Sequence, residues 1–216
     1  MTFPFKERAA AVVRVAEDHV RRLGAVNTIC FEPHMDPRGF NTDYTGFRRA
    51  FQSRFAGRLP GVAAVVGAGG VGRAIAFGLI DLRASEVRLY DRSPERAHAV
   101  AAALGTPQDT PIYVCATLEE AVRGADGLIN ATPQGMYQYP QSAIPQALLP
   151  GCAWAFDAVY TPMQTQFVQD AMAAGLEILY GYELFFYQGV DAFELFTRIT
   201  VDEARLRAAL DAHGPT

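Results

Sequence analysis

The sequence contains little that would place the protein in a membrane, on a nucleic acid or in the secretory pathway. No apolar run reaches the roughly 18 residues that span a bilayer, and the first residues lack the charged stretch, apolar core and cleavage site of a signal peptide. The net charge is −4 and the cationic side chains are dispersed, so we expect no basic face that would neutralise a phosphate backbone. These absences predict a cytoplasmic protein that binds neither membranes nor nucleic acid.

Cysteine and histidine are also sparse. The cysteines, Cys30, Cys115 and Cys152, are odd in number and share no C-x-x-C spacing, so we expect neither a disulfide framework nor a zinc site. We expect all three to be small buried side chains. The histidines show no spacing typical of metal ligands. The sequence therefore predicts no metal cofactor.

Apolar residues, by contrast, are abundant. Half of the 216 residues are hydrophobic, which is enough to bury a core in one large domain or two small ones. Residues 7–23 carry apolar side chains at near-helical spacing and are followed by Gly24, which predicts one helix ending there. An extended run at 25–33 and a helix at 43–55 are expected next.

From residue 61 onward, short apolar runs alternate with helical segments. The expected strands are 61–67, 86–91, 111–115, 127–132, 153–160 and 177–181, and the expected helices between them are 70–83, 94–104, 117–123 and 165–174. Such alternation predicts a parallel sheet covered by helices on both faces. Residues 183–212 are predicted to be helical throughout.

The stretch VVGAGGVGRAIAFGL carries the most specific local signal. Gly67, Gly69 and Gly72 stand in the G-x-G-x-x-G register, directly after a predicted strand and before a predicted helix. Glycines there allow a tight turn, a close approach of the backbone to a pyrophosphate and close packing of helix on strand. Asp91 ends the next strand about twenty residues further on, where a carboxylate accepts hydrogen bonds from the adenosine ribose. The sequence therefore predicts a dinucleotide-binding domain of the Rossmann type.

Asp91 and its neighbour Arg92 bear on which dinucleotide is bound. A carboxylate at the strand end repels the 2′-phosphate of NADP, whereas Arg92 can attract it. Asp91 is expected to dominate, because it faces the ribose while Arg92 can turn into solvent. We predict NAD as the cofactor, with NADP as the alternative.

Six further stretches flank the glycine loop in a fixed order. They are TFPFK (2–6), GAVNT (24–28), GFNTDYTGF (39–47), NATPQGM (130–136), FDAVYTPMQT (156–165) and GYELFFYQGVDAFELF (181–196). Together they resemble the shikimate and quinate dehydrogenase family over essentially the whole chain. The resemblance implies an NAD(P)-dependent oxidoreductase whose small-molecule substrate is shikimate or quinate.

The resemblance also implies roles for particular residues. Lys6 falls at the position of the family's catalytic lysine and Asp43 at that of its partner carboxylate. The implied substrate contacts are Thr2, Asn27, Tyr160 and Gln188. Together with the glycine motif, the implied cofactor contacts are Gly67, Ala68, Gly69, Gly70, Val71, Gly72, Asp91, Arg92, Thr132, Pro133, Met136 and Gly181.

Each polar site residue also has an ordinary structural interpretation. Lys6 can be a solvated cation near a chain end. Asn27 can cap a turn, and Tyr160 and Gln188 can be buried polar groups that satisfy nearby backbone. In the catalytic interpretation, Lys6 removes the hydroxyl proton when its amine is neutral and returns it in the reverse reaction, with Asp43 orienting it. Because two coupled groups titrate together, they are treated as a dyad.

The expected architecture is an α/β fold with two lobes. A Rossmann domain with a doubly wound parallel sheet is predicted over 48–180, and a smaller α/β substrate lobe over 1–47, completed by helices at 181–216. Family members carry a longer N-terminal segment, so either Met1 is an internal methionine of a longer protein or this lobe is N-terminally incomplete. In the second case, exposed sheet edges would favour a homodimer. Two other functions stay open: a non-catalytic dinucleotide-binding protein, and a dehydrogenase for a related ring acid.

Overall fold

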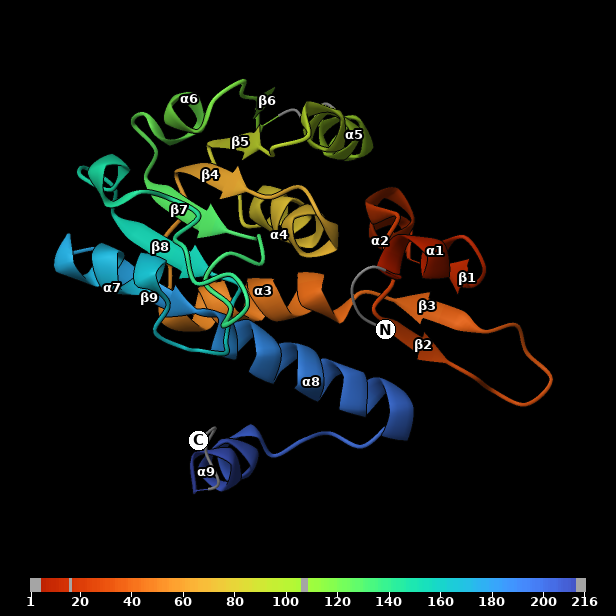
Figure 1. Ribbon diagram of the computed structural model, residues 1–216. Coiled ribbons are helices and arrows are strands. Elements are labelled where there is room, and N and C mark those ends of the chain that lie inside the picture. Colours follow the sequence, from red (N-terminus) through yellow and green to blue (C-terminus); the bar gives the residue numbers. More distant parts are fainter. Residues whose placement is uncertain (1–4, 16, 106–108, 213–216) are drawn as a thin grey trace.

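The computed structural model describes residues 5–15, 17–105 and 109–212, which form two β-sheets with helices packed against them (Figure 1). The larger sheet has parallel strands in the order β6-β5-β4-β7-β8-β9. These strands are β4 (Val62–Val66), β5 (Glu86–Tyr90), β6 (Ile112–Val114), β7 (Gly127–Asn130), β8 (Trp154–Asp157) and β9 (Glu177–Tyr180). The chain runs from β4 outward to β6 and then returns to the other side of β4 at β7. The predicted doubly wound α/β fold is confirmed.

Helices cover both faces of this sheet. One face carries α3 (Thr42–Arg54), α4 (Gly70–Asp81), α5 (Pro94–Leu104) and α8 (Gly181–Thr197); the other carries α6 (Leu118–Val122), α7 (Gln166–Ala173) and the 3-10 turn η1 (Gln146–Leu148) (Figure 1). Successive side chains of a strand point to opposite faces. Accordingly Ala63 and Val65 enter the first core, whereas Ala64 and Val66 enter the second. Burial on both faces explains why β4 reads as an unbroken apolar run.

Aromatic packing fixes α3 on the sheet. Phe47 of α3 packs against Phe156 of β8 with ring centroids 5.3 Å apart, and Phe51 packs against Trp154 at 5.2 Å. All four side chains are at most 1% exposed, and each such burial stabilises the fold by roughly 1.5–3 kcal/mol. The first turn of α3, which carries Asp43, is therefore held in a fixed place relative to the strand ends.

The smaller sheet has the order β1-β3-β2 and belongs to the N-terminal part of the chain. Its strands are β1 (Arg14–Val15), β2 (Thr28–Cys30) and β3 (Arg38–Phe40), with helices α1 (Lys6–Ala10) and α2 (Asp18–Leu23) beside them. Arg73 of α4 donates to the carbonyl of Leu23 at 3.0 Å, and Arg22 donates to the carbonyl of Leu104. Both bonds attach α2 to the helices of the larger sheet. The predicted domain limits stay predictions; α3 runs through the first of them.

The prediction of one helix over residues 7–23 is wrong. The chain instead forms α1, then β1, then α2, which ends at Gly24 with a left-handed φ of +63°. Arg14 donates its backbone N–H to the carbonyl of Pro37 at 2.8 Å and pairs with Arg38 of β3. Val12, Val13 and Val15 are β-branched and favour an extended backbone. Pairing with a strand more than twenty residues later overrides the helical spacing.

The prediction that residues 183–212 are helical throughout is also wrong. α8 ends at Thr197, where Arg198 adopts a left-handed φ of +59°, and α9 (Glu203–Ala212) begins a new helix. The Asp202 side chain accepts from the backbone N–H of Arg205 at 3.0 Å, which caps the start of α9.

The prediction that all three cysteines are buried is confirmed only in part. Cys30 is buried as expected, but Cys115 and Cys152 are half-buried, and all three are free thiols. Partial burial raises the pKa of both Cys115 and Cys152. Across residues 5–15, 17–105 and 109–212, no cluster of three or more His, Cys, Asp or Glu side chains is placed to hold a metal ion. No helix in this described part is long and apolar enough to cross a membrane.

Candidate active site

The loops that follow β4 and β7 lie at the point where the chain changes direction across the sheet. Adjacent strands whose loops lead to opposite sides leave a crevice at their carboxyl ends, which is where open α/β sheets bind ligands. Here β4 leads into the glycine loop and α4, and β7 leads into the segment 131–136. Both segments contain predicted site residues.

The glycine loop has the backbone that its sequence predicts. Gly67 has φ +104°, which side-chain-bearing residues rarely adopt. A Cβ on Gly72 would lie 1.9 Å from the carbonyl oxygen of Gly67, so only glycine permits the close turn. A Cβ on Gly69 would instead meet no atom of the described residues within 4 Å. This open space at the N-terminus of a 12-residue helix fits a dinucleotide pyrophosphate, which helix N-termini bind through free N–H groups.

Asp91 stands next to this loop and supports it. Its Oδ2 accepts from the backbone N–H of Ala68 at 2.7 Å, and its Oδ1 accepts from that of Ser93 at 2.9 Å. Arg92 is exposed to solvent. The structure thus places Asp91 at the strand end, as predicted; its predicted contact with a ribose stays a prediction.

The segment after β7 packs directly on the glycine loop. A Cβ on Gly67 would lie 2.8 Å from Thr132 Cγ2. Thr132 donates both its backbone N–H and its hydroxyl to Asn130 Oδ1, at 3.0 and 2.7 Å. Pro133 and Met136 are exposed beside it. These predicted cofactor-facing residues therefore lie at the same edge of the sheet as the glycines, beyond the carboxyl ends of β4 and β7.

Gly181 begins α8 at the neighbouring strand end. A Cβ there would lie 2.5 Å from the carbonyl oxygen of Asp157, so α8 starts in close contact with the backbone at the end of β8. Gly181 is thus a packing requirement as well as a predicted cofactor contact.

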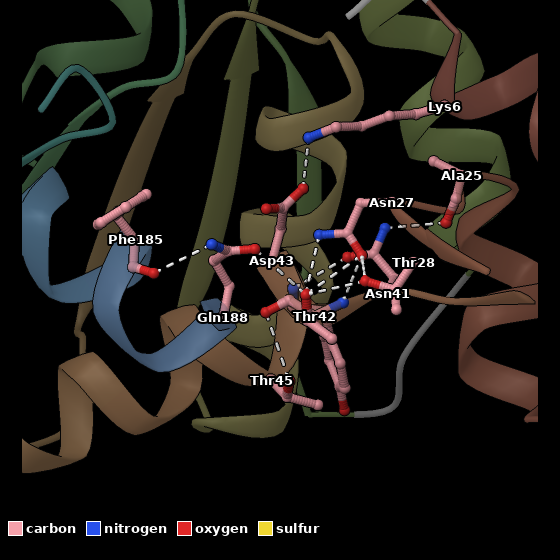
Figure 2. Close-up of polar contacts among 11 residues, drawn as sticks. Lys6, Ala25, Asn27, Thr28, Asn41, Thr42, Asp43, Thr45, Phe185 and Gln188 are labelled. Atoms are coloured by element: carbon pink, nitrogen blue, oxygen red, sulfur yellow. Dashed lines mark hydrogen bonds and ion pairs between the residues drawn. The ribbon is translucent and has the colours of Figure 1, made fainter. Parts of the chain in front are cut away.

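Lys6 and Asp43 form a largely enclosed ion pair (Figure 2). Lys6 Nζ lies 2.5 Å from Asp43 Oδ2, and the two side chains are 13% and 8% exposed. Asn41 caps α3 by accepting from the backbone N–H of Tyr44 at 3.0 Å, which places Asp43 in the first turn near the positive end of the helix dipole. The predicted pair is therefore brought together from α1 and α3.

One contact fixes the backbone of Lys6, and a second places its side chain beside the glycine loop. Val26 donates its backbone N–H to the carbonyl of Lys6 at 2.9 Å. A Cβ on Gly70 would lie 3.2 Å from Lys6 Cδ, so the aliphatic part of the lysine passes over the first residue of α4. Lys6 is also the only lysine in the sequence, since every other basic side chain that is not histidine is arginine.

Thr42 connects the predicted substrate-contacting amides (Figure 2). Asn27 Oδ1 accepts from the backbone N–H of Thr42 at 2.8 Å, and Asn27 Nδ2 donates to Thr42 Oγ1 at 3.0 Å. Thr42 Oγ1 lies 3.4 Å from Gln188 Oε1 of α8. A Cβ on Gly46 would lie 2.8 Å from the backbone nitrogen of Gln188, so Gly46 allows α8 to approach this closely. Asn27 and Gln188 thus flank Asp43, while Thr42 was missed by sequence reasoning although it lies inside the quoted motif.

The remaining predicted substrate contacts are less closely tied to the ion pair. The Tyr160 ring stacks on Phe185 of α8 with centroids 4.8 Å apart and is 45% exposed. Thr2 lies outside the described residues.

Asp157, at the end of β8, was also missed. It is 1% exposed, and burial raises its pKa to about 6, against hydrogen bonds from Thr165, from the backbone N–H of Val159 and from Asn130. A buried carboxylate at a strand end has no local sequence signal other than its position after an apolar run.

This pKa makes a testable contribution to stability. The pKa of Asp157 in the folded state, about 6, lies above its ordinary value of 3.8. The stability that comes from the protonated carboxyl is therefore fully present below about pH 4 and is lost as the pH rises through about 6. Asparagine does not titrate, so Asp157→Asn should gain roughly 3 kcal/mol of unfolding free energy relative to the parent between about pH 4 and about pH 7. Urea unfolding across that range measures it. Asp36→Asn, at an exposed position, is the control; equal pH profiles for Asp157→Asn and the parent would contradict the assignment.

Comparison with known proteins adds independent findings. The model of the ornithine cyclodeaminase/mu-crystallin family matches residues 55–140, which is the first part of the larger sheet. A quinate/shikimate dehydrogenase (NAD(+)) of Corynebacterium efficiens is 36% identical over 211 residues, which cover 96% of this chain and 74% of the relative.

Two solved structures match in fold as well. Quinate dehydrogenase from Corynebacterium glutamicum in complex with NAD superposes with a TM-score of 0.86 at 32% identity, covering 98% of this chain and 76% of that one. Shikimate 5-dehydrogenase from Thermus thermophilus in complex with NADP(H) and shikimate has a TM-score of 0.84 at 36% identity, covering 98% and 77%.

Proposed function

This chain belongs to the shikimate and quinate dehydrogenase family, and we propose that it catalyses the reversible NAD(P)-dependent oxidation of a ring hydroxyl of shikimate or quinate. The observation that carries the proposal is the enclosed Lys6–Asp43 pair, which lies beside an open glycine loop. When bound, the nicotinamide supplies the hydride chemistry. Proton transfer and substrate binding are assigned to side chains of this chain.

Lys6 is the proton-transfer group in this proposal. A group that moves the hydroxyl proton must lie within hydrogen-bond reach of the ring hydroxyl. The aliphatic part of Lys6 passes over Gly70 at the start of α4, and its Nζ is held by Asp43. Asp43 orients the lysine through the 2.5 Å contact and can accept a hydrogen bond from a second hydroxyl with its other oxygen.

Asn27 and Gln188 are proposed to bind the other ring hydroxyls. Both carry amide groups next to Asp43, and Thr42 fixes their orientation. A site of this kind discriminates strongly among polyhydroxylated rings, because an analogue without a hydroxyl leaves a buried polar group unpaired. Shikimate, quinate and related ring acids are all candidates.

Steady-state turnover with shikimate and quinate, each with NAD and NADP, tests the function. Turnover of one of these acids supports it, and turnover of another ring acid alone would change the substrate. NAD binding without any turnover would favour the non-catalytic dinucleotide-binding alternative. Cytoplasmic localisation and a homodimer stay predictions.

We also propose that NAD is preferred over NADP because of Asp91. Its carboxylate is held at the strand end by Ala68 and Ser93, where it opposes a 2′-phosphate. Asp91→Ser should narrow the NAD-to-NADP affinity ratio by about tenfold or reverse it, which corresponds to ~1.4 kcal/mol.

Calorimetric titration of both nucleotides into the parent and into Asp91→Ser measures this ratio. Glu119→Gln removes an exposed carboxylate from the first turn of α6, elsewhere on the same sheet, and is the control for net charge. Tighter binding of NADP than of NAD by the parent would contradict the proposed role of Asp91.

A further inference from the structure

Asp157 is a buried carboxylate that no described cation neutralises. It ends β8 and is 1% exposed, and each of its oxygens accepts hydrogen bonds from neutral donors. Burying a charge without a counter-charge costs several kcal/mol unless hydrogen bonds compensate. An apolar residue would fit a strand end at lower cost, so the arrangement calls for a reason beyond packing.

The donors to Asp157 come from different segments. Oδ1 accepts from Asn130 Nδ2 at 2.9 Å and from the backbone N–H of Val159 at 3.0 Å. Oδ2 accepts from Thr165 Oγ1 at 2.6 Å. Asn130 ends β7, Val159 lies in the loop after β8, and Thr165 caps α7. One carboxylate therefore joins the carboxyl ends of two strands to the start of a helix.

Through Asn130 and Thr165, Asp157 is connected to both ends of the segment 131–136. Asn130 Nδ2 also donates to the carbonyl of Gln134 at 2.8 Å, while Asn130 Oδ1 accepts from Thr132. Gly135 has φ +104°, and a Cβ there would lie 2.9 Å from Thr165 Cγ2. The segment is thus hydrogen-bonded to Asn130 at one end and packs closely against Thr165 at the other.

This segment borders the side of the crevice away from the adenosine. A dinucleotide bound across the switch point would place its adenosine half toward β5 and Asp91, and its other half toward β7 and β8. Thr132 touches the glycine loop at Gly67, and the backbone of Asp157 touches Gly181 at the start of α8. The nicotinamide half would therefore be received by the elements that Asp157 joins.

We propose that Asp157 is a positioning residue of the dinucleotide site, which acts through Asn130 and Thr165 to hold the segment 131–136 in the shape that receives the nicotinamide half of the cofactor. The inference rests on the proposed function, because it presupposes that this chain binds a nicotinamide dinucleotide. It assigns Asp157 no contact with the cofactor. It predicts that loss of Asp157 harms NAD binding while sparing nucleotides that lack the nicotinamide.

The test compares NAD with ADP as calorimetric ligands. Asp157→Ala should weaken NAD binding at least tenfold and leave ADP binding within about twofold, since ADP needs only the glycine loop and the β5 end. Asp157→Asn keeps acceptors and donors in nearly the same places and should restore most of the NAD affinity. Thr165→Val, which keeps the side-chain shape but removes one donor to Asp157 and the cap of α7, should give an intermediate loss.

Asp126→Ala is the matched control. Asp126 also ties strands together, since its Oδ2 accepts from the backbone N–H of Val62 at 2.7 Å, but it precedes β7 and lies at the opposite end of the sheet. It should lower thermal stability without changing the NAD-to-ADP affinity ratio. Hydrogen exchange of the ligand-free proteins provides a second readout: Asp157→Ala should speed exchange in 131–136, and Asp126→Ala should not.

The possible outcomes separate this inference from the proposed function. If the parent binds neither NAD nor NADP, the proposed function fails. If the parent binds NAD and Asp157→Ala binds NAD equally well, or loses NAD and ADP in parallel, the positioning role is overturned. Should Asp157→Ala not fold, a normal NAD-to-ADP affinity ratio for Thr165→Val would also overturn it.

Discussion

Replacing Lys6 by alanine should lower kcat for shikimate or quinate by about 10²–10⁴-fold, which is the range that a general acid–base group contributes. The affinity for NAD should stay unchanged, because the glycine loop and Asp91 hold their places without the lysine side chain. A residue that acts mainly in the transition state lowers kcat rather than raising KM. Steady-state kinetics together with a direct NAD titration measures both quantities.

Two further variants separate proton transfer from charge. Lys6→Arg keeps a cation beside Asp43, but a guanidinium is always charged and cannot exchange the proton, so it should be nearly as inactive as Lys6→Ala. Arg8→Ala removes an exposed cation from the same helix and should be fully active. If Lys6→Ala turns over within about threefold of the parent, far short of a general base's contribution, Lys6 is not the proton-transfer group and its pair with Asp43 is structural.

The absence of any other lysine offers a chemical test of the same residue. An amine-acylating reagent can modify only Lys6 and the α-amine, and the two are told apart by peptide mapping. Loss of turnover should follow acylation of Lys6, and shikimate or quinate should slow it if the ring acid lies against Nζ. Acylated Lys6 in a fully active protein would contradict the proposed role.

The parts of this structure that sequence reasoning predicts are those fixed by local rules. The glycine register of Gly67, Gly69 and Gly72 dictates its own turn, and β4 reads as a buried strand because both of its faces are covered. The break between α1 and α2 is not local. It depends on the pairing of Arg14 with Pro37 and Arg38 across the small sheet, and these partners lie more than twenty residues further along the chain.

The site divides in the same way. Lys6 and Asp43 are 37 positions apart, and only the resemblance to a family, not any spacing, predicts that they meet. Thr42 and Asp157 were missed because their importance depends on which elements they join. Thr42 joins α3 to Asn27 and to Gln188 of α8, and Asp157 joins β7, β8 and α7. The importance of residues that connect helices and strands can be recognised only in the assembled fold.

Gly69 and Gly72 lie in one motif, yet their replacement by alanine should have opposite consequences. A Cβ on Gly69 meets open space, and its backbone has φ −77°, which alanine adopts without strain. A Cβ on Gly72 would lie 1.9 Å from the carbonyl oxygen of Gly67, so the turn must deform. We therefore predict that the ligand requires glycine at position 69, whereas the fold requires it at position 72.

Gly69→Ala should keep the melting temperature of the ligand-free protein, or raise it slightly, because the unfolded chain loses entropy. It should nevertheless weaken NAD binding by about 10²–10⁴-fold, since the methyl group would occupy the place proposed for the pyrophosphate and about two charge-assisted hydrogen bonds would be lost at about 1.5–3 kcal/mol each. Gly72→Ala should destabilise the ligand-free protein by about 1–3 kcal/mol, which lowers the melting temperature by about 2–4 °C per kcal/mol. Thermal melting without ligand and NAD titration of both variants give the two readouts. NAD affinity of Gly69→Ala within about threefold of the parent would mean that the open space at this helix N-terminus is not where the pyrophosphate binds, because a displaced phosphate costs far more than that.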